Sequence, residues 1–369
     1  MTKKVFALLM LSVFVLTAYA QEDADEWMMV NLQSGQETEV SVSDECTDEC
    51  ELPALLPIEE EMENFDVEEE IRFLDFDIED TLYDEQNLVP TRIVGEDSRE
   101  NITERAQGVA KAAVVLAIAF PVKGSGFCSG VMVGPRLVLT AAHCLFSPER
   151  KGEEAKKVLV VANGVKGKPR AAALDRWIPK RFVVKKGKNR FIVDGRHDVA
   201  LLVLDKPLGN ITGIAGLKVL PEGQYDNLPV TAFGRGADKD WHSLWKSVGK
   251  VGIVHDVFLF TNLPVLAGNS GSPAINSSEQ VIGLFTSDQH PLTIRGILRY
   301  PIPALGVMVK LRDKWRGIDD YPNIILKLRP SLINVIQEAN RMVNQWEQRT
   351  ASQSQLSDKK KKQNKTRSI

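Results

Sequence analysis

Short β-rich runs separated by turn residues are the feature that most restricts the fold of this chain. Between positions 112 and 309, apolar and β-branched residues recur in short stretches, with Gly, Pro, Asn and Asp between them. The clearest stretches are residues 113–119, 131–140, 158–161, 199–204, 230–233, 251–254, 257–261 and 281–286. Many short strands with turns between them are typical of an all-β sandwich or barrel pair rather than of alternating βα units.

The pattern changes to a helical period near the C-terminus. Residues 331–346 place their apolar side chains on one helical face, and Pro330 stands at the start, where proline is favoured. The members of this face are Leu332, Val335, Ile336, Ala339, Val343 and Trp346. We predict a helix that packs on the body, followed by a disordered basic tail over residues 351–369.

Charge divides the 369-residue chain into two parts. Residues 21–92 hold 25 acidic and two basic residues, a net charge of −23, whereas residues 93–369 hold 24 acidic and 42 basic residues, a net charge of +18. Parts of opposite charge are natural partners, so we interpret residues 21–92 as an acidic prosegment bound to the chain's own basic body. A disordered tail is the alternative. The basic body also favours a contact with polyanions, but no motif indicates a specific nucleic-acid partner.

The first twenty residues have the pattern of a secretory signal peptide. Lys3 and Lys4 precede an apolar stretch over residues 5–16, and Ala18 and Ala20 form a small-x-small cleavage site before Gln21. A membrane anchor is the alternative, but the apolar stretch is shorter than the ~20 residues that span a bilayer. No other segment is long and apolar enough to span. We therefore expect a secreted or periplasmic protein.

Four cysteines suit an oxidising compartment. Cys46 and Cys50 lie in the acidic segment, and Cys128 and Cys144 lie in the body. A metal site is the competing interpretation, but no Cys-x2-Cys spacing and no flanking histidine pair is present, so two disulfides are favoured. We expect neither a metal nor another cofactor.

Three short motifs carry the chemistry. His143 lies in residues 139–144 at the end of one β-rich run, and Asp198 opens the apolar run at 199–204. Ser270 lies in the Gly-rich hexapeptide GNSGSP at 268–273. Each motif alone is weak, but their order His, Asp, Ser is that of the chymotrypsin-like triad and not that of α/β-hydrolases.

The residue types fit nucleophilic catalysis. A serine hydroxyl is a poor nucleophile at neutral pH, so Ser270 needs a base, and His143 is the candidate. Asp198 would bind the other ring nitrogen and stabilise the imidazolium. The backbone amides of Gly268 and Ser270 would form the oxyanion hole of an acyl-transfer reaction.

At these motifs the chain, from about position 92 to 309, resembles the trypsin-like serine peptidases, and most of all their bacterial glutamyl endopeptidase branch. The hexapeptide, the strand at 281–283, the stretch 244–250 and the opening 92–99 carry this resemblance. It implies two perpendicular six-stranded β-barrels with the triad in the cleft between them, and a C-terminal helix, within a peptidase domain at 93–350. It also implies a disulfide between Cys128 and Cys144.

Two features depart from the patterns of the family, one beside Ser270 and one in the substrate pocket. Asn269 stands where trypsin-like zymogens carry the aspartate that pairs with the freed N-terminal amine; the glutamyl branch also has asparagine there. In the substrate pocket, Phe285 and Val265 stand where that branch binds a glutamate side chain through histidine and threonine. An apolar pocket would desolvate a carboxylate without pairing it, so we predict no strict glutamate preference.

The function that these features indicate is a secreted serine endopeptidase made as a preproprotein, which hydrolyses protein or peptide substrates through an acyl-enzyme. A catalytically silent protein that binds polyanions and an esterase on the same scaffold are the alternatives. The mature chain would begin at Arg92 or at Ile93, and the motif allows both.

Overall fold

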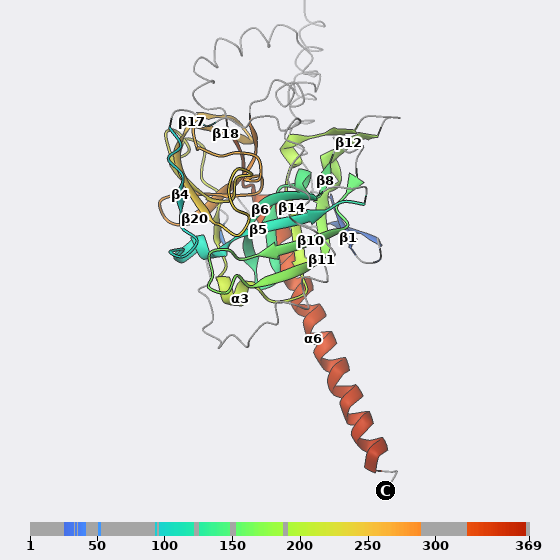
Figure 1. Cartoon of the computed structure of the whole chain (residues 1–369). Helices are drawn as coiled ribbons and strands as arrows, with labels where there is room; N and C mark the ends of the chain where they lie inside the picture. Colours follow the sequence, from blue (N-terminus) through green and yellow to red (C-terminus); the bar gives the residue numbers. More distant parts are fainter. Residues whose placement is uncertain are drawn as a thin grey trace, which may run out of the picture.

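The computed structural model describes residues 26–32, 34, 36–41, 51–52, 93, 96–121, 125–147, 153–186, 191–288 and 323–366. Strands dominate this part of the chain and form two closed barrels, from which one long helix projects (Figure 1). The signal-peptide region, Cys46, Cys50 and the Arg92 junction lie outside the described residues.

The first barrel closes through six antiparallel strands. Their order is β5-β6-β7-β14-β11-β10, and β10 pairs with both β5 and β11. The bounds are β5 (Ala113–Ala119), β6 (Ser125–Gly134), β7 (Leu137–Thr140), β10 (Lys157–Val161), β11 (Arg170–Pro179) and β14 (Ala200–Leu204). All residues of β7 and β14 are buried, as expected for short, continuously apolar strands.

The second barrel closes through six further strands, in the order β19-β16-β17-β18-β21-β20, with β19 paired to β20. The bounds are β16 (Pro229–Gly234), β17 (Trp245–Val254), β18 (Phe258–Thr261), β19 (Pro273–Ile275), β20 (Gln280–Asp288) and β21 (Asn323–Lys327). The Gly-rich hexapeptide therefore belongs to the second barrel, since it precedes β19. The segments of His143 and Asp198 belong to the first barrel, next to β7 and β14.

Shorter elements complete the described part. The strands are β4 (Glu100–Asn101), β8 (Phe146–Ser147), β9 (Glu153–Glu154), β12 (Val183–Lys186), β13 (Phe191–Val193) and β15 (Gly216–Lys218). The helical turns are η2 (Gly108–Ala112), η3 (Ala142–Cys144), η4 (Lys180–Phe182), η5 (Gly195–His197) and α3 (Gly209–Thr212). The predicted all-β class, with two six-stranded barrels and a C-terminal helix, is confirmed.

The acidic segment contributes strands beside both barrels. β1 (Glu26–Asn31) and β2 (Glu37–Ser41) form a hairpin, and β1 pairs antiparallel with β11 of the first barrel. β3 (Glu51–Leu52) pairs with β15, which in turn pairs with β20 of the second barrel. Trp27 is only 1% exposed and belongs to the main apolar core. These residues are therefore strands and not the disordered tail that was the alternative.

The C-terminal helix α6 (Pro330–Thr366) begins where the sequence predicts but runs further. Its apolar face is buried through Val343, whereas Trp346 is 45% exposed with Arg136 over its ring, so placing Trp346 on the packed face was wrong. The helix continues through Thr366, into the region for which disorder was predicted, and extends away from the barrels (Figure 1). No Gly or Pro interrupts residues 331–366, so no residue with a strong penalty ends the helix earlier.

Candidate active site

His143 and Asp198 are in direct contact. His143 lies in η3 directly after β7, and Asp198 lies between η5 and β14; these two strands are paired, with Ala200 opposite Thr140. The distance from His143 Nδ1 to Asp198 Oδ2 is 2.7 Å, and the His143 backbone amide donates to Asp198 Oδ1 at 2.8 Å. The carboxylate thus holds His143 by one hydrogen bond to its imidazole and one to its backbone amide, an arrangement that fixes the orientation of the ring.

The neighbouring His197 has a different partner. Its Nδ1 lies 3.3 Å from Asp194 Oδ2, and both side chains are less than 10% exposed. Burial alone would raise the pKa of Asp194, but hydrogen bonds from His197 and Arg196 hold that pKa well below its usual range. His197 therefore braces the turn before Asp198 and does not supply a second base beside His143.

A disulfide braces the histidine segment. Cys128 of β6 and Cys144 of η3 are bonded, with a Cα–Cα distance of 6.2 Å. Cys144 Sγ lies 4.0 Å from His143 Nε2 and 3.8 Å from the carbonyl oxygen of Ser270. The imidazole and the backbone of Ser270 are thus both next to the same sulfur.

The turn that carries Ser270 lies against the first barrel. The Ser129 amide donates to the Ser270 carbonyl at 2.8 Å, and the Gly271 amide donates to the Phe285 carbonyl at 2.7 Å. Gly271 has a φ of +82°, and a Cβ at this position would lie 2.2 Å from the Ser129 carbonyl oxygen. Only glycine fits this position, both for its φ and for the space around it.

The backbone amides of this turn fall into two groups, those that donate within the turn and those that do not. The Asn269 amide donates to the Leu266 carbonyl at 3.0 Å, and the Ser272 amide donates to the Asn269 carbonyl at 2.8 Å. Among the residues that the structure describes, the amides of Gly268 and Ser270 have no acceptor. Donors of this kind are suited to an oxyanion, because no existing bond must break first.

Asn269, which directly precedes Ser270, is buried at 3% exposure. Its Nδ2 donates to the Leu266 carbonyl at 3.1 Å, so the amide is satisfied by the local backbone. The Asn269 side chain is neutral and already hydrogen-bonded, so it offers no ion pair to a charged amine.

Val265 and Phe285 lie in the apolar core of the second barrel. Val265 is 0% and Phe285 1% exposed, within one buried cluster. The Phe285 backbone nevertheless borders the nucleophile turn, because its amide donates to Ser272 and its carbonyl accepts from Gly271. Residues 289–322, which follow β20, lie outside the described residues.

Two polar residues next to the turn at residues 268–270, Ser129 and Arg235, were not predicted from the sequence. Ser129 Oγ donates to the Gly268 carbonyl at 2.9 Å and accepts from the Arg235 amide at 3.1 Å. Arg235 is 3% exposed and donates to the Lys239 carbonyl at 2.6 Å, with Phe127 at 4.7 Å from its guanidinium. The one sequence feature that could have indicated Ser129 is its position directly after Cys128.

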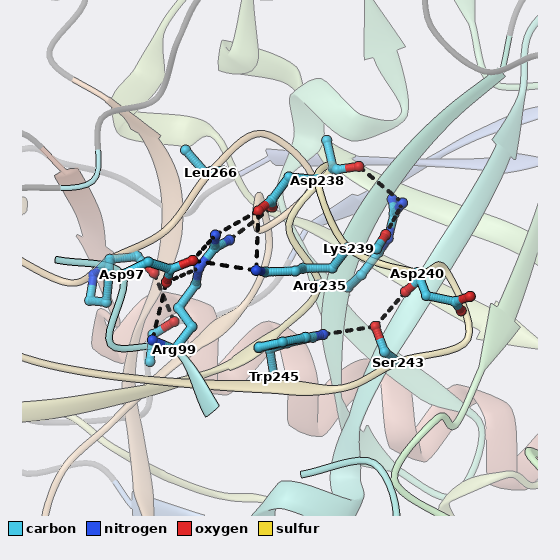
Figure 2. Close-up of polar contacts among 12 residues, drawn as sticks. Asp97, Arg99, Arg235, Asp238, Lys239, Asp240, Ser243, Trp245 and Leu266 are labelled. Carbon is cyan, nitrogen blue, oxygen red and sulfur yellow. Dashed lines mark hydrogen bonds and ion pairs between the residues drawn. The ribbon is translucent and has the colours of Figure 1, made fainter. Parts of the chain in front are cut away.

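An ion-pair cluster surrounds the buried side chain of Arg99, with Asp97 and Asp238 each 38% exposed (Figure 2). Arg99 donates to both Asp97 and Asp238 through paired hydrogen bonds of 2.6–2.9 Å. Lys239 Nζ lies 3.3 Å from Asp97 and 3.4 Å from Asp238, so two cations face two carboxylates. Hydrogen bonds from Arg99 hold the pKa of Asp97 well below its usual range.

In the described part of the chain, one group of side chains has metal-like spacing: Cys128, His143 and Cys144. Both sulfurs are consumed by the disulfide, and a disulfide lacks the thiolate that binds zinc. This donor set does not fit a metal. No helix among the described residues has the length and apolar character needed to cross a membrane.

Comparison with known proteins finds similarity to peptidases. Residues 128–284 match the family described as trypsin-like peptidase domain. A glutamyl endopeptidase of Staphylococcus epidermidis is 29% identical over 208 residues, covering 53% of this chain and 66% of the relative. A Bacillus subtilis protein named extracellular metalloprotease is 25% identical over 189 residues, covering 51% of this chain and 58% of the relative.

A solved structure described as Glu endopeptidase in complex with MPD aligns with a TM-score of 0.49 at 15% identity, over 68% of this chain and 100% of that chain. The chain spans just under two thirds of the length of the Staphylococcus relative. The resemblance to trypsin-like peptidases, close to the glutamyl endopeptidase branch, is confirmed by the family match and this relative.

Proposed function

Starting from a chain that carries a trypsin-like peptidase domain, we propose that it is a serine endopeptidase in which His143, Asp198 and Ser270 form the triad. The observation that carries this proposal is the 2.7 Å contact between His143 and Asp198, next to a turn with two open amides. The contact would orient a base for Ser270, and the amides would supply the oxyanion donors of an acyl transfer.

The proposed reaction has two halves. His143 Nε2 takes the proton of Ser270 Oγ as the oxygen attacks the peptide carbonyl, and the same nitrogen then protonates the leaving amine. Water repeats the sequence on the acyl-enzyme and releases the carboxylic acid. Gly268 and Ser270 stabilise the oxyanion in both halves, with each donor contributing roughly 3–4 kcal/mol.

Proteins or peptides are the proposed substrates, without a strict requirement for glutamate. Both residues that stand at the glutamate-binding positions of the family, Val265 and Phe285, are apolar and lie fully buried in the core of the second barrel, so neither offers a partner for a carboxylate. An isolated carboxylate there would lose hydration without gaining a partner.

Residues 21–92 are the proposed prosegment of this enzyme, with cleavage before Arg92 or before Ile93. The pairing of β1 with β11 and of β3 with β15 supports a segment bound to its own body. Lys180 of the body lies 2.6 Å from Glu39 and 3.4 Å from Glu26, which adds charge complementarity. Backbone pairing and the burial of Trp27 make this docking more than electrostatic.

The proposed location is outside the cytoplasm, secreted or periplasmic. The signal-like pattern of residues 1–20 and the Cys128–Cys144 disulfide support it. The printed name of the Bacillus subtilis relative, an extracellular protease, points the same way.

The test is intact mass after reaction with a fluorophosphonate probe. Wild type and a Ser278→Ala variant, which alters an exposed serine, should each gain a single adduct, and Ser270→Ala should gain none. Fluorescein-labelled casein should be cleaved only by the proteins that take the adduct. Labelling with ester cleavage but intact casein would favour an esterase, and an unlabelled wild type would refute the proposal.

A further inference from the structure

The Arg99 cluster joins two distant parts of the chain. Asp97 and Arg99 precede β4, just after the expected start of the mature chain, whereas Asp238 and Lys239 lie in the loop that follows β16. The Arg99 side chain is only 2% exposed, so its guanidinium depends on these carboxylates for its hydrogen bonds. Asp97 and Asp238 are each 38% exposed, so the buried partner is Arg99, and removing one carboxylate takes two of its four side-chain hydrogen bonds to these acids.

The loop held by this cluster packs directly on the nucleophile turn. The Ala237 amide donates to the Ala267 carbonyl at 2.6 Å. A Cβ on Gly268 would lie 2.8 Å from the Arg235 carbonyl oxygen and 3.1 Å from the Ala237 nitrogen, so the two backbones are in close contact. Gly268 itself has a φ of +91° and carries one of the two open amides.

Arg99 and Asn269 meet at the same glycine of this loop. A Cβ on Gly236 would lie 2.7 Å from Arg99 Nη1 and 3.2 Å from Asn269 Nδ2. The backbone of Gly236 thus lies between the Arg99 guanidinium and the Asn269 side chain, and Figure 2 shows Arg99 paired with Asp238 of the same loop. Moving the loop away from Gly268 would remove the contact that limits the orientation of its amide.

Taking the proposed peptidase activity as its premise, we propose that Arg99 is a positioning residue for the oxyanion hole. Its two ion pairs hold the 236–239 loop against Gly268, which fixes the direction of the amide. Because the docking uses side chains within the chain, it needs no freed α-amine. Asn269, already bonded to Leu266, makes no demand for one.

The experiment measures the rate constant and the endpoint of fluorophosphonate labelling for wild type, Arg99→Gln, Asp238→Asn and Arg105→Gln. Arg105 pairs with Glu100 at the exposed end of the same segment and is the matched control, expected to label at the wild-type rate. Loss of one oxyanion donor costs about 10²–10³ in rate, so a misaligned donor in Arg99→Gln should slow labelling at least ~10-fold. Asp238→Asn, which keeps the size of the side chain, should slow it less but in the same direction.

The endpoint separates positioning from stability. A residue that only stabilises the fold would lower the fraction of labelled protein and leave the rate constant of that fraction unchanged, which would overturn the proposal. If Arg99→Gln does not fold, Asp238→Asn alone decides through the same two quantities. With fluorescein-casein, the positioning role predicts a lower kcat and a nearly constant KM.

Wild type that takes no label overturns the peptidase function and this inference together. Equal labelling rates in wild type and Arg99→Gln overturn the inference alone.

Discussion

Trp27 is expected to hold the acidic segment on the first barrel. Its side chain is 1% exposed, and its strand β1 pairs with residues 175–179 of β11. A tryptophan buries about 150–250 Å², and Trp→Ala changes in cores cost about 3–5 kcal/mol. If residues 21–92 are cut from the body, this loss falls on their binding, so Trp27→Ala should weaken it roughly 10²- to 10³-fold or more.

The assay uses a variant with a specific protease site between residues 53 and 92. After cleavage, the fraction of the N-terminal fragment that co-elutes with the body is measured over decreasing protein concentrations, which gives the Kd. Trp27→Phe keeps most of the apolar area and removes an indole N–H that has no acceptor among the described residues. It should therefore bind far better than Trp27→Ala.

Glu26→Gln is the electrostatic control. Glu26 is 66% exposed and lies 3.4 Å from Lys180, and exposed pairs contribute at most about 1 kcal/mol, or roughly 5-fold in affinity. Raising the salt concentration to about 0.5 M should remove only this part, because strand pairing and apolar burial are not screened. Release of the fragment by salt alone, or equal effects of Trp27→Ala and Glu26→Gln, would refute the reasoning.

Three further predictions concern the body. Removing the Cys128–Cys144 disulfide, which closes a separation of 16 residues, should lower the free energy of unfolding by about 3 kcal/mol, measured by urea titration of the double alanine variant; an unchanged midpoint would contradict this. Gly271→Ala should abolish fluorophosphonate labelling. Gly223→Ala, with a similar φ of +86° and no atom within 4 Å, should keep labelling and lower the free energy of unfolding by only the ~1–2 kcal/mol of backbone strain. Equal loss of labelling in both variants would exclude the steric argument. The pKa of Asp194 lies well below its usual range despite the burial of the side chain. The ionised carboxylate therefore stabilises the fold fully above the unfolded-state pKa of about 3.9. This stabilisation is lost as the pH falls through the folded-state pKa. The stability gap between wild type and Asp194→Asn should therefore shrink from pH 7 to pH 3 in urea titrations, and a constant gap would disagree.

Local pattern was sufficient to predict an all-β sandwich or barrel pair, and the family resemblance implied the two six-stranded barrels, but not all of the strands were predicted. The apolar runs at 113–119 and 199–204 became β5 and β14, because continuous apolar residues bounded by turn residues specify a buried strand. β11 was missed because Arg170–Pro179 mixes small alanines with charged residues and has no long apolar run. Its position is set by its three neighbouring strands, which no local pattern reveals.

In the candidate site, too, some contacts were predicted from the sequence and others were not. The contact between His143 and Asp198 was predicted through the order of the motifs and the family resemblance, and it lies across 55 residues of chain. The pair of Arg99 and Asp238 spans 139 residues and has no motif, because any exposed arginine and aspartate have the same local appearance in a sequence. Trp346 fits the helical period, but the helix has already passed the edge of the core at Val343.

The packing of α6 has a consequence for the order in which the protein can fold during synthesis. Leu332, Ile333 and Ile336 belong to the same buried cluster as the first barrel, and Asn340 donates to the carbonyl of Val133 in β6. The first barrel is therefore covered by residues that the ribosome adds after both barrels have been translated. Although N-terminal units usually fold first, here the earlier barrel keeps an open apolar face until residues 332–340 have emerged from the ribosome. A nascent chain stalled before residue 330 should thus expose this face.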